Sequence, residues 1–101
     1  MNIKVMKNDD NLIIEKNGKV EVFESYTASD ILLHFENNED IIEEKSIEEL
    51  FKNISKDKVK AGIDSLEAEA LTFMTKKDLE KLKKSYQKED LSDAKLIKEY
   101  N

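Results

Sequence analysis

Short apolar runs rich in β-branched residues, each bounded by polar turn residues, occupy the first 25 positions of the chain. In NLIIEKNGKVEVFES, Asn17-Gly18 separates two such runs, and Asn-Gly supplies the positive φ angles of a type I′ hairpin turn. A two-residue loop pairs Ile13 with Val22 on one face and leaves apolar residues on the other face too. The preceding run NIKVMK adds a strand, because two strands alone are marginal in water. We therefore expect a three-stranded antiparallel meander over residues 1–25.

From Tyr26 onward the apolar residues recur at helical spacing, and a capping residue stands before each of the first four stripes: Thr27, Ser46, Ser55 and Thr75, all but Ser55 with an acidic residue three positions later. This pattern predicts four to five short helices over residues 26–101, in a single α+β domain that spans residues 1–101. The predicted apolar stripes are Ala28, Ile31, Leu32 and Phe35; Ile47, Leu50, Phe51 and Ile54; Val59, Ile63, Leu66, Ala70 and Phe73; Leu79, Leu82 and Tyr86; and, in a last short helix capped by Ser92, Leu96, Ile97 and Tyr100.

Length and composition exclude several classes of protein. A chain of 101 residues with 39% hydrophobic residues can bury one modest core, and 40% charged residues imply a heavily solvated surface. Without cysteine there is no disulfide framework, thiolate metal site or thiol nucleophile. The N-terminal MNIKVMKNDD lacks the apolar core of a secretory signal, and no uninterrupted apolar run exceeds three residues. We expect a cytoplasmic protein.

The net charge of the chain is concentrated in one segment. All 17 basic residues are lysines, and the 23 acidic residues bring the net charge to −6. The fifteen residues Glu36–Leu50 contain seven acids and one lysine, which is also −6, so the remaining 86 residues are neutral overall. The lysines concentrate elsewhere, above all in TKKDLEKLKKSYQK. The molecule is therefore expected to be dipolar.

Only part of this acidity has an ordinary structural explanation. Glu48 and Glu49 fall opposite the apolar face of their predicted helix, favour its positive N-terminal end, and allow an i,i+4 pair between Glu48 and Lys52. The other acids flank two isoleucines in residues 39–45, which are compatible with an edge strand or a loop. We assign partner binding to Glu36, Glu39, Asp40, Glu43, Glu44, Glu48 and Glu49, together with Leu33, which falls opposite the apolar stripe of its own helix.

Candidate catalytic and metal-binding patterns are sparse. The single histidine, His34, lies four residues after Asp30 on one helical face, and such a pair can orient an imidazole as a general base. A histidine at the edge of an apolar stripe explains the same pattern. The stretches KNDDN and ENNED lack the spacing of a calcium loop, and two isolated glycines cannot form a phosphate-binding loop. We expect no catalytic residue, metal or cofactor.

Two helices joined by a tight turn are predicted over residues 59–88, in the outline of a helix-turn-helix, and the second carries six lysines. Lysine binds phosphates, but arginine, the commonest specific reader of guanine, is absent. A solvated lysine face explains the pattern as well. DNA binding by this pair is therefore the alternative hypothesis.

The expected function is that of a small acidic intracellular protein–protein interaction protein, an inhibitor or adaptor that presents Glu36–Glu49 to a basic, nucleic-acid-binding partner. The alternative is the DNA-binding module of residues 59–88, and the third hypothesis is an enzyme built on Asp30 and His34. The basic residues are all lysines, and Asn and Ile are frequent. This composition is typical of an AT-rich genome and of small proteins from phages or mobile elements. No pattern predicts the oligomeric state.

Overall fold

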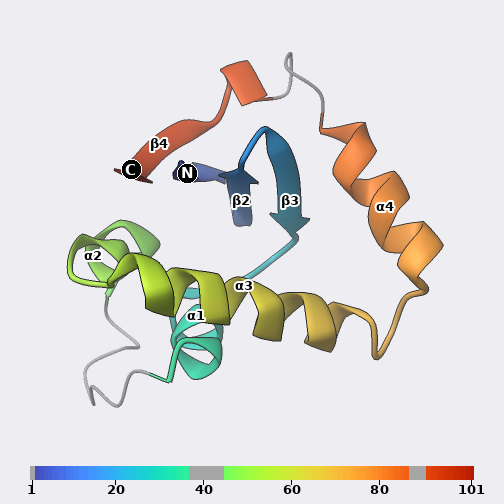
Figure 1. Ribbon diagram of the computed structural model, residues 1–101, viewed down its shortest axis with the longest axis horizontal. Coiled ribbons are helices and arrows are strands. Elements are labelled where there is room, and N and C mark those ends of the chain that lie inside the picture. The colour runs from blue at the N-terminus through green and yellow to red at the C-terminus, as the bar shows by residue number, and fades with distance from the viewer. Residues whose placement is uncertain (1, 37–44, 87–90) are drawn as a thin grey trace.

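The computed structural model describes residues 2–36, 45–86 and 91–101, and these fold as one α+β domain, as expected. In the part of the chain that the structure describes, three strands come first, four helices follow, and a fourth strand comes last (Figure 1). The elements are β1 (Ile3–Asn8), β2 (Asn11–Lys16), β3 (Lys19–Phe23), α1 (Ala28–His34), α2 (Ile47–Lys52), α3 (Lys56–Ala70), α4 (Lys76–Ser85) and β4 (Lys95–Tyr100).

The four strands form one antiparallel sheet in the order β3-β2-β1-β4. The predicted hairpin is confirmed: Ile13 lies opposite Val22, and Asn17 and Gly18 both adopt positive φ angles, of 53° and 81°. The N-terminal strand also pairs with β2, so the three-stranded meander is present. The sheet is larger than predicted because β4, at the other end of the chain, extends it beyond β1.

The prediction of a helix after Ser92 is wrong, since residues 95–100 form the strand β4. The pairing register shifts where Val5 lies opposite Lys98 but the next β1 residue lies opposite Leu96, so Ile97 is the extra residue of a β-bulge. A bulge lets two strand residues three positions apart face the same side. Ile97 and Tyr100 both pack on the main core for this reason, and their spacing therefore imitates that of a helix.

Hydrogen bonds of Tyr100 secure β4 to the helices. The Tyr100 hydroxyl lies 3.1 Å from the carbonyl oxygen of Phe51 and 2.7 Å from that of Ile54, at the end of α2. Carbonyls at a helix end have no partner within the helix, so a buried hydroxyl placed there meets a requirement of the fold. Burial raises the pKa of Tyr100 from 10 to about 12, so the hydroxyl keeps the proton that it donates further into the alkaline range.

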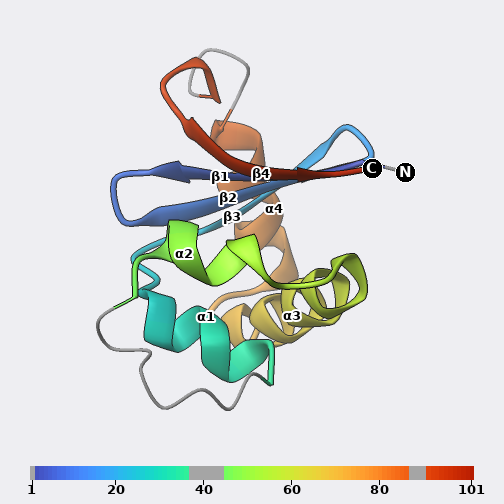
Figure 2. The same cartoon turned by 90° about the vertical axis from the view of Figure 1, so that its left-hand side faces the viewer.

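Helices α1, α2 and α3 all lie on one face of the sheet and enclose the main core (Figure 2). The predicted stripes of these helices are buried with one exception, Phe73, whose side chain is 67% exposed. The helix α3 ends at Ala70 because Thr72 turns back: its backbone N–H and its hydroxyl both donate to the carbonyl of Glu69. Phe73 therefore lies beyond the helix, in the turn that leads to α4.

Gly62 allows α1 and α3 to approach closely. A Cβ atom at this position would overlap the aromatic ring of Phe35, which lies against the helix backbone there. The same ring packs edge-on against Phe51, with ring centroids 5.4 Å apart. Because Gly62 has no side chain, the Phe35 ring can contact both α3 and Phe51 of α2. A glycine inside a helix lowers the stability of that helix, and this loss accompanies the close packing.

The opposite face of the sheet is covered more lightly. Helix α4 crosses the β3 edge of the sheet, from the helical layer toward the other face (Figures 1 and 2). On that face a small second cluster forms around buried side chains of the three meander strands. It consists of Met6, Ile13 and Val22, with Val20, Tyr86, Leu91 and Ala94 packed against them.

Candidate functional site

The predicted acidic surface is partly described by the structure. Glu36 and Glu49 are exposed, and Glu36 adopts a positive φ angle of 54° just after α1. Glu48 is half-buried, and its Oε1 lies 3.2 Å from Nζ of Lys95 on β4. The sequence suggested Lys52 as the partner of Glu48. The pair between Glu48 and Lys95, which are 47 residues apart, was not predicted because β4 was expected to be a helix. The remaining members of the predicted surface, Glu39, Asp40, Glu43 and Glu44, lie outside the described residues.

The helical half of the acidic segment is built as predicted. The Ser46 hydroxyl accepts a hydrogen bond from the backbone N–H of Glu49 and so caps α2. Ile47, Leu50 and Phe51 are buried on the opposite face of the same helix. The carboxylates of this half therefore stand on a helix that the main core holds in place.

The fold brings further acids to Glu48 from distant parts of the chain. An open hollow of about 640 Å³ lies between the turn that joins β1 to β2, the first turn of α2 and the start of β4. Asp9, Asp10 and Asp93 line it and are exposed. No sequence pattern predicts this grouping, since the two aspartates of KNDDN are indistinguishable from ordinary turn residues. The lining residues are Lys7, Asn8, Asp9, Asp10, Glu48, Asp93 and Lys95.

Leu33 is 79% exposed, so no neighbour in the described part of the chain buries it. Its side chain points away from the apolar stripe of α1, as the helical spacing predicted. An exposed leucine is compatible with a partner contact, although single exposed apolar residues are common on protein surfaces.

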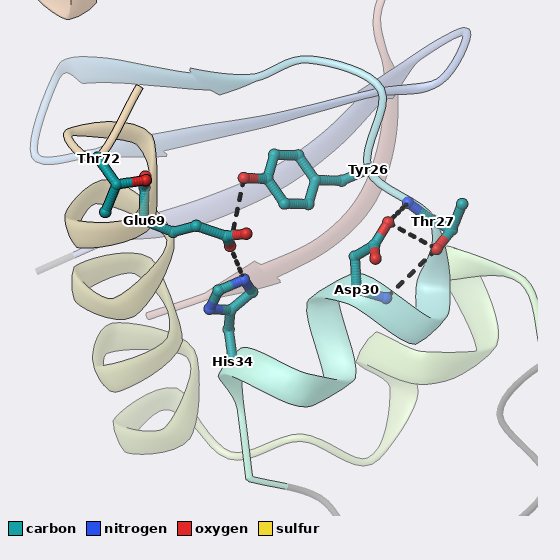
Figure 3. Close-up of polar contacts among 6 residues, drawn as sticks. All are labelled: Tyr26, Thr27, Asp30, His34, Glu69 and Thr72. Atoms are coloured by element: carbon teal, nitrogen blue, oxygen red, sulfur yellow. Dashed lines mark hydrogen bonds and ion pairs between the residues drawn. The ribbon is translucent and has the colours of Figure 1, made fainter. Parts of the chain in front are cut away.

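Asp30 does not serve as the orienting partner of His34 in this structure. One oxygen of its carboxylate, Oδ2, accepts hydrogen bonds from the Thr27 backbone N–H at 3.1 Å and from the Thr27 hydroxyl at 2.8 Å. In return the Thr27 hydroxyl accepts from the Asp30 backbone N–H. These contacts complete the capping box at the start of α1 (Figure 3). The i,i+4 spacing of Asp30 and His34 therefore reflects helix capping.

The carboxylate that pairs with His34 belongs to another helix. Its Nε2 pairs with Oε2 of Glu69 on α3, and the Tyr26 hydroxyl lies 3.5 Å from the same oxygen (Figure 3). The Tyr26 ring packs edge-on against His34, with centroids 6.2 Å apart. Burial raises the pKa of Tyr26, and the negative charges of Glu69 and Asp30 raise it further. This cluster joins α1 to α3 across the helical layer.

The chemistry open to this cluster is limited. A carboxylate-oriented histidine acts as a base on a group within hydrogen-bond reach. The Tyr26 hydroxyl contacts the Glu69 oxygen that pairs with His34, and its raised pKa makes it a poor nucleophile at neutral pH. The side chain of His34 is 12% exposed, so solvent and substrate reach it only at its edge. A structural link between two helices accounts for the arrangement.

A second charged cluster links three elements and was not predicted. Nζ of Lys83 on α4 lies 2.8 Å from Oε1 of Glu67 on α3 and 3.7 Å from Oε1 of Glu21 on β3. Burial raises the pKa of Glu21, and the nearby Lys83 opposes that effect only in part. The other oxygen of Glu21, Oε2, is buried and accepts no hydrogen bond from the described residues. The sequence could not reveal this cluster, because its members lie 16 or more positions apart.

A groove of about 490 Å³ runs beside this cluster, between β3 and α4. Its lining carries both signs of charge and one aromatic ring. The lining residues are Lys19, Val20, Glu21, Glu80, Lys83, Lys84 and Tyr86.

No group of three or more His, Cys, Asp or Glu side chains within residues 2–36, 45–86 and 91–101 is arranged to hold a metal ion. Within the same residues, no helix has both the length and the apolar character needed to cross a membrane.

Comparison of the chain with protein-family models, with curated proteins and with solved structures finds no match. No activity of a relative therefore bears on its function. What the protein does must be inferred from its own charges, burial and contacts.

Proposed function

We propose that this protein is a small protein–protein interaction protein, an inhibitor or adaptor, that presents the acidic surface Glu36–Glu49 to a basic partner. The observation that carries the proposal is the concentration of charge. Glu36–Leu50 accounts for the whole net charge of −6, while the other 86 residues balance. Acids spread for solubility alone would not gather in this way.

The fold supports this proposal at the helical end of the segment. Exposed Asp9, Asp10 and Asp93 line the same hollow as Glu48, although they come from distant parts of the sequence. They add negative charge to a region that is already acidic, and only Lys7 and Lys95 among the lining residues oppose it. The acidic surface is therefore wider than the segment that suggested it.

The partner that fits best is a protein with a lysine- or arginine-rich surface, of the kind that binds nucleic acid. Such a cleft is built to attract closely spaced phosphates, and an array of carboxylates offers a similar field. An acidic protein seated there would exclude the nucleic acid by occupying its site. The proposed role as an inhibitor follows from this competition.

The proposal is tested by affinity capture from the native host, with bound proteins identified by mass spectrometry. A stable basic protein that elutes when the salt concentration is raised is the expected result, because exposed charges are screened within about 8–10 Å at physiological ionic strength. Recovery of nucleic acid without a protein partner would instead favour the DNA-binding alternative. Capture of neither class would count against both.

The alternative, DNA binding through residues 59–88, has one supporting observation. Lys76, Lys77 and Lys81 are exposed on α4, where phosphates could reach them. However, α4 packs against β3, and Lys83 is engaged by two carboxylates of the protein itself. The enzyme hypothesis now depends on His34 with Glu69 as its carboxylate partner, since Asp30 is occupied by the cap of α1.

A further inference from the structure

The turn between α3 and α4 exposes two large apolar side chains. Phe73 is 67% exposed and Leu71 is 43% exposed, with one residue between them in the sequence. The other exposed large apolar residues in the described part of the chain, Leu33 and Leu96, lie on different elements, α1 and β4. Single exposed apolar residues are ordinary, whereas exposed apolar residues that occur together often mark a contact with another molecule. The turn is therefore a candidate contact surface.

Backbone hydrogen bonds secure this turn. The N–H groups of Phe73 and Met74 donate to the carbonyl of Ala70 at 3.2 and 3.1 Å, and the Leu71 N–H donates to the carbonyl of Glu67 at 3.1 Å. Carbonyls at the end of a helix have no partner within it, and these bonds satisfy them. The exposed ring of Phe73 thus stands on an ordered backbone, so a partner that covers it does not have to order the turn first.

The fold gains little from the position of Phe73. Burial on the two sides of the turn is provided by Ala70 and Leu79, and Met74 is half-buried. Apolar stabilisation scales with the area removed from water, and two thirds of the Phe73 side chain remains in water. A polar residue at this position should therefore leave folding intact, which allows binding to be tested without loss of the structure.

Two lysines without an ionic partner follow the exposed ring. Lys76 and Lys77 begin α4, three and four residues after Phe73, and both are exposed. Lys83 of the same helix pairs with carboxylates, but neither Lys76 nor Lys77 forms an ion pair with a described residue. The N-terminal end of a helix favours negative charge, so these two lysines do not stabilise α4 through its dipole. Their positive charge is available to an acidic molecule.

We propose that Leu71, Phe73, Lys76 and Lys77 form an apolar–basic surface, and that its occupant is an acidic amphipathic segment of a partner protein. The apolar side of the segment covers Phe73, and Asp or Glu residues beside it pair with the two lysines. Phosphates would engage the lysines but would leave the apolar side chains in water. The apolar–basic surface lies at the opposite end of α3 from α2 (Figure 1), so this inference goes beyond the function proposed for the acidic surface and does not rest on it.

An anionic membrane is the main competing occupant, because apolar residues beside lysines also bind to membrane surfaces. The net charge of −6 disfavours a membrane. A membrane presents a broad negative field, which repels the many acids of the molecule while it attracts the two lysines. A peptide segment acts mainly on the charges next to it, because exposed charges are screened within about 8–10 Å at physiological ionic strength. The charge distribution therefore favours a protein segment.

Selection from a display library of random peptides tests the apolar–basic surface with a defined probe. The unmodified protein is the target, and the Phe73→Ser protein removes peptides that bind elsewhere. The remaining peptides should carry Asp or Glu beside apolar residues, and Phe73→Ser should weaken their binding in solution at least about tenfold. The matched control is Leu33→Ser, which removes an exposed leucine from α1 and should leave their affinity unchanged. Remaining peptides rich in Lys or Arg, or a selection that yields none, would overturn the proposal.

The two lysines are tested with the same peptides. Lys76→Gln combined with Lys77→Gln should weaken binding by about tenfold and remove most of its salt dependence. The matched control combines Lys19→Gln with Lys58→Gln, which removes the same charge from exposed positions outside the surface. Equal losses in the two double variants would show that net charge, and not this surface, attracts the peptides.

Two further measurements distinguish the other occupants. The protein should not float with vesicles of phosphatidylserine and phosphatidylcholine, and its mass in sedimentation equilibrium should be the same with and without Phe73→Ser. Vesicle binding that Phe73→Ser abolishes would replace the acidic segment by a membrane. Self-association that Phe73→Ser abolishes would replace it by a second copy of the chain. Either result would overturn the proposal.

Discussion

The acidic helix α2 and the lysine-rich helix α4 are both highly charged on their outer faces, yet the structure holds them very differently. Three of the six residues of α2 are buried in the main core, and the carbonyls at its C-terminal end bind the Tyr100 hydroxyl. Only one of the ten residues of α4 is buried, and a lysine of the helix takes part in its attachment. The charges of α2 therefore lie on a helix that the main core holds in place, whereas the charges of α4 lie on a helix that buries one of its ten residues.

The largest expected effect on stability comes from a buried residue of α2. Phe51 is fully buried and packs edge-on against Phe35, so Phe51→Ala should lower the free energy of unfolding by about 3–5 kcal/mol. Chemical denaturation measures this change. Leu82→Ala on α4, where the side chain is only partly buried, should have a much smaller effect. Similar losses for the two variants would remove the contrast between the helices.

Gly62→Ala sharpens the same contrast, because alanine would normally stabilise a helix interior relative to glycine. Here the added methyl group overlaps the Phe35 ring, and we expect a loss of roughly 1–3 kcal/mol of unfolding free energy from overpacking. Phe35→Leu should reduce the penalty when the two substitutions are combined, which a double-mutant cycle would detect. A stabilised Gly62→Ala protein would show that the helices do not approach as closely as described.

The pH dependence of stability tests the unfavourable part of the α4 contact. Burial raises the pKa of Glu21 above its ordinary value of 4.5, so the folded state holds this proton more tightly than the unfolded state. Its contribution to stability is therefore greatest in acid and declines as the pH rises from about 4.5 through the raised pKa of the folded state. Glu21→Gln should consequently be more stable than the unmodified protein at neutral pH, and the difference should vanish below pH 4.5. Thermal melts across this range measure it, and a destabilised variant at pH 7 would mean that the pair with Lys83 outweighs burial.

Much of this architecture was readable from local signals, and the parts that were missed depend on distant contacts. Asn17-Gly18 predicted the hairpin, and Ser46, Ser55 and Thr75 marked the starts of three helices, because turns and caps are formed by neighbours in sequence. The strand β4 was missed because a bulge gave Ile97 and Tyr100 helix-like spacing.

The candidate sites show the same division. The opposite placement of Glu49 and the apolar face of α2 followed from helix geometry. Two other groupings arise only when the sheet and the helices pack together. They are the ion pair of Lys83 with Glu21 and the grouping of Asp9 and Asp93 beside Glu48. No local pattern encodes either of them.

The smallest expected effect concerns nucleic acid. If the lysines of α4 serve only as a solvated surface, the protein should not bind a generic DNA duplex at low salt, and changing Lys76, Lys77 and Lys81 to Gln should alter nothing in a gel-shift assay. Tight binding that weakens steeply with salt and is lost in the triple variant would reverse the ranking of the two functions.

The most direct measurement of the proposed function is the rate of association with the captured partner after removal of four acids. Changing Glu39, Asp40, Glu43 and Glu44 to Gln or Asn brings the net charge from −6 to −2 while keeping similar side-chain shapes. The control is Glu24→Gln, Asp57→Asn, Asp64→Asn and Glu99→Gln, which makes the same change of net charge at exposed positions outside the acidic surface.

If the acidic surface steers or contacts the partner, the first variant should fold normally, associate more slowly or dissociate faster, and lose most of its salt dependence, whereas the control should bind nearly as the unmodified protein does. Unchanged association and dissociation rates in the first variant, or equal losses in both, would show that the acidic segment is not the binding surface.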